Sequence, residues 1–203
     1  MLRGPNLGLV ADYMRTIEQV VAGACVTDQH GNEMALDIAV RLSGQVMRDA
    51  HDRGNRVFFV GNGGSAGICS HLATDFSKNG GMRAMSLNDP AVLTCLGNDF
   101  GYEHVFAKQV EWHAHAGDLL VAISSSGQSK NILAAVEAGQ SAGCWIFTLS
   151  GFLPDNPLRR MGDLNFYLSN RQYGFVEVGH LALMHSVLDI QMGWRPPEML
   201  DAG

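Results

Sequence analysis

Apolar residues recur at helical spacing through the first quarter of the chain. One set fits a single amphipathic helix: Leu9, Tyr13, Ile17, Val20 and Val21. A second set fits another: Leu36, Ile38, Ala39, Leu42, Val46 and Met47. A turn at 30–32 separates them, and no convincing strand is expected between residues 9 and 53. Because both helices carry an apolar face before any sheet begins, we expect these N-terminal helices to mediate oligomerisation.

From residue 54 onwards, short apolar runs alternate with helical patterns. Runs of β-branched and aromatic residues that end in small polar residues predict buried strands of a parallel sheet. Strands are expected at 56–60, 83–87, 118–124, 144–149 and 164–168. Helices are expected near 65–78, 89–97 and 129–142, with a last one from Val176 to Met192. This alternation predicts one α/β domain over 1–203, with a helical segment (1–53) before the sheet core and final helix (54–192).

Composition narrows the class of protein. The 203 residues are 46% hydrophobic and 17% charged, which is typical of a folded chain with a sizeable core. The net charge of −6, without any local Lys/Arg cluster, argues against nucleic acid as a partner. The chain contains no long apolar run and no secretory leader pattern, and its four cysteines lack metal or disulfide spacing. These features predict a soluble cytoplasmic protein with no membrane partner.

Two of the predicted strands end in loops rich in Gly and Ser, at 61–65 (Gly-Asn-Gly-Gly-Ser) and at 124–129 (Ser-Ser-Ser-Gly-Gln-Ser). Such a loop lets the backbone approach a ligand closely, and the N–H groups of the next helix can bind an anion. Neither loop matches the glycine patterns of triphosphate or dinucleotide sites, whereas serine hydroxyls suit a small monophosphate. The alternative is a pair of ordinary strand-to-helix turns capped by serine.

Four segments together resemble the sugar-isomerase (SIS) domain. They are Gly-Asn-Gly-Gly-Ser at 61–65, Gly-Asn-Asp-Phe-Gly at 97–101, Ala-Gly-Asp-Leu-Leu-Val-Ala-Ile-Ser at 116–124 and Ser-Ser-Gly-Gln-Ser at 125–129. Within that superfamily they are most similar to the phosphoheptose isomerases, over about residues 10–192. The resemblance implies a three-layer fold with a five-stranded parallel sheet flanked by helices. It also implies a homotetramer with active sites between subunits.

The resemblance assigns roles to individual residues. Ser65, Ser124, Ser126 and Ser129 are implied to bind the substrate phosphate, with Gly63, Gly64 and Ser125 in the same loops. Asn62 and Asp99 are implied to contact the sugar, and Glu177 is included among the substrate-binding residues. The implied reaction converts sedoheptulose 7-phosphate to D-glycero-D-manno-heptose 7-phosphate through an enediol.

A second group of residues carries acid, base and metal-binding chemistry. His71 and Asp75 are four residues apart and therefore share one face of a predicted helix, while Glu177 and His185 lie on the final helix. Histidine and carboxylate are ligands that zinc accepts. The resemblance implies that His71, Asp75, Glu177 and His185 hold a divalent metal, for which zinc is expected. It also implies that Asp75 and His185 are the acid/base pair of the isomerisation.

The alternative for His71 and Asp75 is a simple surface pair on the helix. His180, also on the final helix, is interpreted as a core histidine. The remaining histidines that we considered are expected at the surface: His51, His104, His113 and His115.

Three positions depart from the usual pattern of the family. Asp75 stands where a Glu is usual, Glu177 where a Gln is usual, and Gly174 where an Asp is usual. These departures leave open an isomerase of another sugar phosphate. A further alternative is a non-catalytic SIS protein that binds a phosphosugar or a protein partner, as do relatives that associate with a replication initiator. The joint presence of His71, Asp75 and His185 favours an enzyme.

Overall fold

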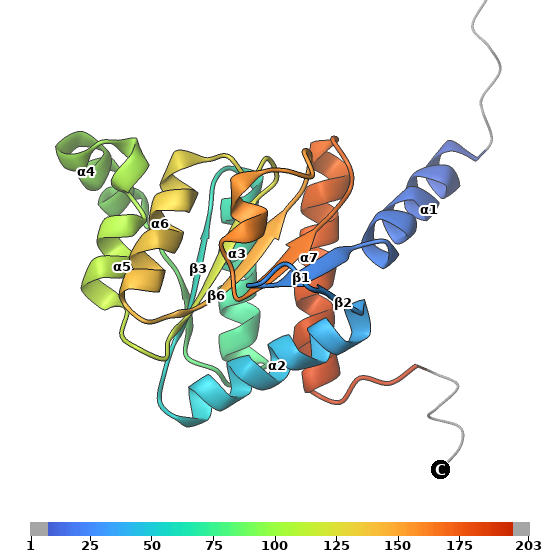
Figure 1. Ribbon diagram of the computed structural model, residues 1–203, viewed down its shortest axis with the longest axis horizontal. Coiled ribbons are helices and arrows are strands. Elements are labelled where there is room, and N and C mark those ends of the chain that lie inside the picture. Colours follow the sequence, from blue (N-terminus) through green and yellow to red (C-terminus); the bar gives the residue numbers. More distant parts are fainter. Residues whose placement is uncertain (1–7, 197–203) are drawn as a thin grey trace, which may run out of the picture.

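A computed structural model of the chain describes residues 8–196 and has a seven-stranded sheet at its centre (Figure 1). The strand order is β2-β1-β7-β6-β5-β3-β4. The strands are β1 (Cys25–Asp28), β2 (Glu33–Met34), β3 (Val57–Gly61), β4 (Ala84–Ser86), β5 (Leu119–Ser124), β6 (Trp145–Ser150) and β7 (Leu164–Tyr167). Strands β3 to β7 are parallel, which confirms the five predicted strands.

The expectation that residues 9–53 contain no strand is wrong. Strand β1 pairs antiparallel with β7 on one side and with the short β2 on the other. Only Val26 of β1 is buried, so the segment shows none of the alternation or apolar length by which a strand is recognised. The hairpin forms because β7 would otherwise leave an unpaired sheet edge, and β1 supplies the missing backbone partners.

The helices are α1 (Leu9–Ala22), α2 (Leu36–Asp52), α3 (Gly64–Lys78), α4 (Pro90–Phe100), α5 (Ala107–His113), α6 (Lys130–Ser141) and α7 (Tyr173–Gln191). Two short 3-10 helices are η1 (Tyr102–His104) and η2 (Pro157–Arg160). Helix α4 starts where predicted because the Asp89 carboxylate accepts hydrogen bonds from two backbone N–H groups of its first turn. Helix α5 was not predicted, and α7 begins three residues earlier than expected. Within residues 8–196, no helix has the length and apolar character needed to cross a membrane.

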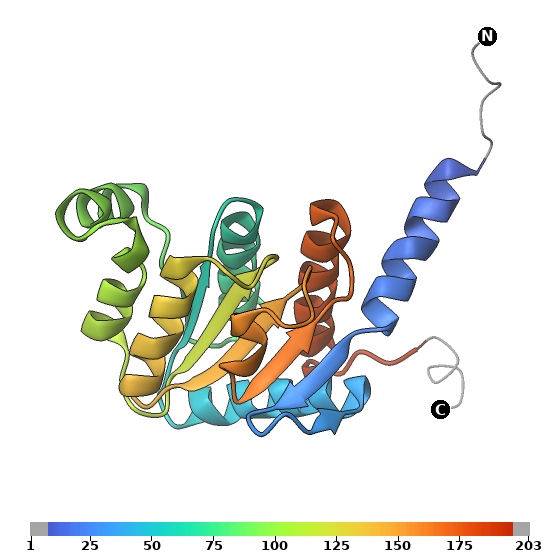
Figure 2. The ribbon, with the colours of Figure 1, turned by 45° about the horizontal axis from the view of Figure 1, so that its top comes forward.

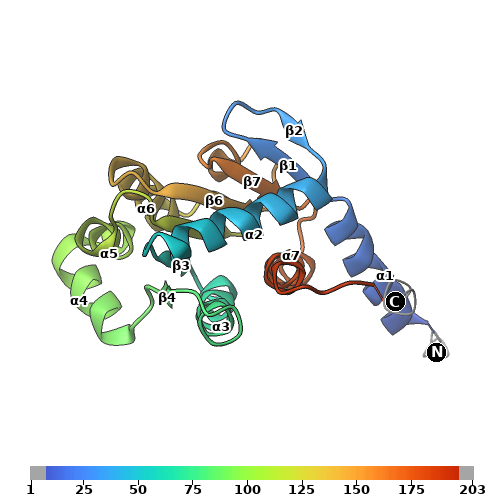
Figure 3. The ribbon, with the colours of Figure 1, turned by 90° about the horizontal axis from the view of Figure 1, so that it is seen from below.

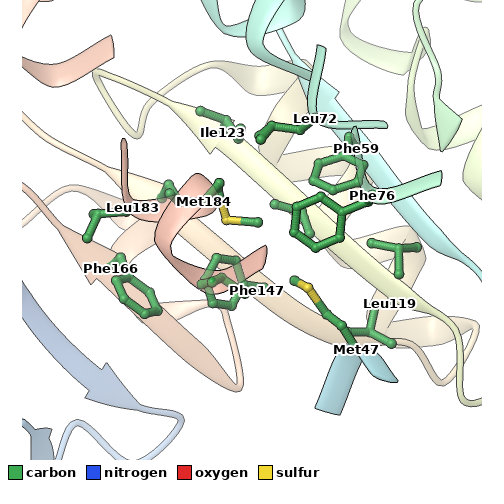
Figure 4. Close-up of a cluster of buried hydrophobic side chains, with 14 of the residues drawn as sticks. Met47, Phe59, Leu72, Phe76, Leu119, Ile123, Phe147, Phe166, Leu183 and Met184 are labelled. Carbon is green, nitrogen blue, oxygen red and sulfur yellow. The ribbon is translucent and has the colours of Figure 1, made fainter. Parts of the chain in front are cut away.

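The helices cover both faces of the sheet and make two cores (Figure 3). Helices α2, α3 and α7 pack on one face, where Phe59, Phe76 and Met184 are fully buried (Figure 4). Helices α4, α5 and α6 pack on the other, around alternate strand residues such as Phe58. This burial on both faces explains why the central strands are continuous apolar runs.

Helix α1 extends away from the body of the molecule at the β1 end of the sheet (Figure 2). Its attachment includes Tyr13, whose ring lies 4.6 Å from that of Phe175 on α7. Leu9, Val10 and Met14 are 58–72% exposed on this helix. Apolar side chains are therefore exposed where the sequence predicts an oligomerisation segment.

Candidate functional site

The two loops rich in Gly and Ser lie side by side at one edge of the sheet. Strands β3 and β5 are parallel neighbours, with Gly61 opposite Ile123, so the loops that follow them meet at the carboxyl ends of the strands. Between them is a cavity of about 250 Å³. It is lined by Asn62, Gly63, Gly64, Ser65, Ile123, Ser124, Ser125, Ser126, Ser129, Tyr173 and Glu177. The structure therefore brings together every predicted substrate-binding residue except Asp99.

The loop between β5 and α6 has the chemistry of an anion cradle. Ser124 Oγ accepts a hydrogen bond from the Gly127 N–H and lies 3.3 Å from Ser129 Oγ. Ser129 is the N-cap residue of α6 but makes no side-chain capping bond. Ser125 Oγ is buried at the cavity wall without a hydrogen-bond partner among residues 8–196. A buried hydroxyl of this kind calls for a partner, and a bound phosphate would supply acceptors.

Glycines permit two close approaches at the cavity. Gly127 has φ of 63°, and a Cβ there would lie 1.9 Å from Asn156 Oδ1, so the loop is pressed against a buried asparagine. At Gly64, the first residue of α3, a Cβ would lie 2.6 Å from both carboxylate oxygens of Glu177. The Glu177 carboxylate is thus held against the N-terminal end of α3, where the helix dipole favours negative charge.

Asn62 is fixed by a network that ties the first loop to the second. Its Nδ2 donates to Asn131 Oδ1 at 2.8 Å, and Asn131 Nδ2 donates back to Asn62 Oδ1 at 2.9 Å. Tyr102 Oη donates to the same Asn62 oxygen at 3.0 Å. Both acceptor sites of the Asn62 amide are filled, which leaves one N–H for a ligand in the cavity.

Asp99 is not among the residues that line this cavity. It lies on α4, where its carboxylate accepts a hydrogen bond from the neighbouring Asn98 amide at 2.8 Å and lies 3.6 Å from the Cys95 thiol. Its implied contact with the sugar stays a prediction.

A separate group of three side chains can hold a metal ion. His71, Asp75 and His185 each offer one ligand atom, and these atoms all lie within 4.8 Å of one another. His71 Nε2 is 3.3 Å from Asp75 Oδ2 and 3.1 Å from His185 Nε2. Two imidazoles and a carboxylate form a donor set that suits a divalent transition metal such as zinc. The fourth predicted ligand, Glu177, does not belong to this group.

The group of three and the cavity lie along the same pair of helices. At one end Glu177 of α7 contacts Gly64 of α3, and further along His185 of α7 faces His71 of α3. Glu177 and His185 are eight residues apart, which corresponds to about 12 Å along the helix axis. Within one chain, the anion cradle and the His/Asp/His group are therefore distinct places joined by the α3–α7 pair.

Residues 27–151 match the SIS domain family, which is more than half of the chain. The chain belongs to the SIS domain family.

Several relatives of this SIS protein are phosphoheptose isomerases. It is 34% identical over 148 residues to a phosphoheptose isomerase from Pelobacter propionicus, covering 70% of this chain and 78% of the relative. It is 30% identical over 179 residues to a phosphoheptose isomerase from Aliarcobacter butzleri, covering 85% and 90%. Among solved structures, a phosphoheptose isomerase from Neisseria gonorrhoeae superimposes with a TM-score of 0.78 at 26% identity, covering 94% of this chain and 99% of that one.

His180 occupies the core of the SIS domain, as the sequence predicted. The side chain is fully buried, and its Nε2 is 3.1 Å from the backbone oxygen of Ser150. Burial lowers the pKa of His180 to about 4, with the hydrogen bond to Ser150 opposing the shift. The ring is therefore neutral at physiological pH and has a structural role.

Three residues at the cavity of this SIS domain were not predicted from the sequence. Asn131 and Tyr102 hold Asn62, and Tyr173 lines the cavity. Asn131 follows the second loop by two residues and Tyr102 follows the segment at 97–101 by one. The closeness of Asn131 and Tyr102 in sequence to these two segments could have indicated their place at the site. Nothing in the local pattern marked Tyr173.

Proposed function

We propose that this protein is a phosphoheptose isomerase, which converts sedoheptulose 7-phosphate to D-glycero-D-manno-heptose 7-phosphate. The observation that carries the proposal is the combination of a serine-lined anion cavity with the His71, Asp75 and His185 group on one pair of helices. The substrate has its phosphate at C7 and its reacting carbons, C1 and C2, at the opposite end. A site for this substrate needs an anion cradle and a separate group for proton transfer.

The reaction moves one proton between adjacent carbons. A base removes a proton from C1 of the ketose while the C2 oxygen gains one, which gives the enediol. Return of a proton to C2 and loss of the proton on O1 then form the C1 aldehyde. We assign these transfers to Asp75 and His185, whose Oδ2 and Nδ1 atoms are 3.9 Å apart. A carboxylate and an imidazole can exchange protons in both directions.

His71, Asp75 and His185 are the proposed metal ligands, and zinc is the proposed ion. A bound cation would polarise the substrate carbonyl and stabilise negative charge on the enediol oxygens. Glu177 is more than two helical turns from His185, so its proposed part is to face the sugar within the cavity.

The proposal includes a homotetramer in the cytoplasm, with sites shared between subunits. The exposed apolar residues of α1 support an oligomer, as does Ile38 of α2, which is 60% exposed. In the proposed tetramer, a neighbouring subunit brings its His/Asp/His group to this chain's cradle, as the resemblance to the phosphoheptose isomerases implies.

The second candidate is a non-catalytic SIS protein that binds a phosphosugar. Such a protein would need the cavity, but it would not need His71, Asp75 and His185 to lie close together. An assay of purified protein with a panel of ketose phosphates, with and without chelator, separates the two. Aldose formation from sedoheptulose 7-phosphate supports the proposal; binding without turnover of any ketose supports the second candidate.

A further inference from the structure

Tyr173 stands out among the residues that line the cavity. Among the described residues that line the cavity it is the only aromatic one, and it is 61% exposed, at the first position of α7. Its hydroxyl makes no hydrogen bond within the described chain. Beside it, a Cβ at Gly174 would lie 2.9 Å from Tyr13 Oη, so Tyr13 of α1 packs against the first turn of α7. A tyrosine in this position offers an apolar face and a free hydroxyl to whatever enters.

Phe152 holds the Tyr173 ring in place. The two rings meet edge to face, with centroids 4.9 Å apart and planes at 76°. Phe152 has φ of 59° and is the one non-glycine residue of the described chain with positive φ. A bulky residue in this conformation is strained and persists only where its surroundings enforce it. Here the Phe152 N–H donates to the Asn170 oxygen and its oxygen accepts from Tyr167 Oη.

Charge decides which part of a ligand meets Tyr173. Tyr173 and Glu177 are four residues apart on α7, so both side chains project from one face of the helix. The Glu177 carboxylate repels a phosphate dianion, whereas the serine hydroxyls of the loop at 124–129, which line the same cavity, can donate hydrogen bonds to it. We therefore expect the phosphate to bind at the serines and the carbon chain of the sugar to lie against α7.

We propose that Tyr173, braced by Phe152, is a specificity-determining residue that packs on the carbon chain of the sugar phosphate and does not contact the phosphate. The identity of the sugar phosphate rests on the proposed function, whereas the location of the contact at Tyr173 does not. The ring would cover C–H groups of the chain, and the hydroxyl would bond a sugar hydroxyl. Phe152 acts through Tyr173 and is a positioning residue.

The test compares sugar phosphate with inorganic phosphate by calorimetry. For Tyr173→Ala we expect the Kd for sedoheptulose 7-phosphate to rise roughly tenfold, while the Kd for inorganic phosphate stays unchanged. Tyr173→Phe should give a smaller rise. Phe152→Gly keeps the positive φ without strain but removes the ring that packs against Tyr173. It should therefore shift the ratio of the two Kd values in the same direction as Tyr173→Ala, without lowering the melting temperature. Trp112→Ala, which removes an exposed aromatic ring on α5, is the control and should change neither value.

Two results would overturn the inference: an unchanged ratio of the two Kd values in Tyr173→Ala, or a wild-type protein that binds sedoheptulose 7-phosphate no better than phosphate. If Tyr173→Ala changes the ratio of the two Kd values but the wild type shows no turnover, the Tyr173 contact is supported and the isomerase proposal is contradicted. If the wild type turns over the substrate but Tyr173→Ala leaves the ratio unchanged, the isomerase proposal is supported and the Tyr173 contact is contradicted.

Discussion

His71 and His185 are 114 residues apart in the chain, yet their Nε2 atoms are 3.1 Å apart. At this distance one nitrogen must carry hydrogen and the other a lone pair, unless both lone pairs face a shared cation. Asp75 lies within 4 Å of both rings. The arrangement is compatible with a three-ligand metal site.

Removal of either imidazole should therefore weaken metal binding. We expect wild-type protein to bind one zinc per chain, and His71→Ala or His185→Ala to lower the affinity at least tenfold. Titration calorimetry with zinc alone measures this. His115→Ala, an exposed histidine outside the group, is the control. If His71→Ala and His185→Ala bind zinc as tightly as the wild type and the His115→Ala control, His71 and His185 are not metal ligands.

The serine loop should dominate phosphate recognition. A hydrogen bond to a charged group contributes about 1.5–3 kcal/mol, so Ser126→Ala or Ser129→Ala should weaken binding of phosphosugar and of inorganic phosphate roughly tenfold or more. Ser141→Ala, at the exposed end of α6, should have no effect. Calorimetry that finds wild-type affinity in both loop variants would exclude this loop as the cradle.

His180 should make stability depend on pH. Its folded pKa, lowered to about 4, lies below the ordinary value of 6.5, so the unfolded state binds more protons between these values. The contribution of the neutral His180 to the free energy of unfolding is complete above pH 6.5 and is lost as the pH falls towards 4. The loss amounts to roughly 3 kcal/mol.

Urea unfolding at pH 7 and pH 4.5 measures this loss. His180→Gln cannot titrate and should show a smaller difference between the two pH values, while retaining part of the activity. An identical pH dependence in His180→Gln would contradict the assignment.

Much of this architecture follows from the sequence, because its determinants are local. The five parallel strands are buried on both faces and therefore appear as apolar runs, and the two loops appear as abrupt changes to Gly and Ser. Strands β1 and β2 could not be predicted, since what stabilises them is the open edge of β7 rather than their own composition. The convergence of His71 with His185 depends on the packing of α3 against α7, and the separation of Glu177 from them follows from helix geometry.

A site shared between subunits makes a further prediction. Ser126→Ala/Ser129→Ala chains and His185→Ala chains should each be nearly inactive, but co-expressed mixed tetramers should contain sites with an intact cradle and an intact His/Asp/His group. Random assortment gives about a quarter of wild-type activity. Light scattering should report a tetramer for each protein. If mixed tetramers are as inactive as their parents, the cradle and the group act within one chain.

The most direct test of the central claim is turnover itself. Purified protein is incubated with sedoheptulose 7-phosphate, and formation of the heptose 7-phosphate is followed by NMR in D₂O alongside His185→Ala and His115→Ala. We predict product with deuterium at C2 from exchange of the migrating proton, loss of turnover in His185→Ala with an unchanged melting temperature, and full activity in His115→Ala. Wild-type activity in His185→Ala, or no aldose from the wild-type protein with zinc supplied, would contradict the account.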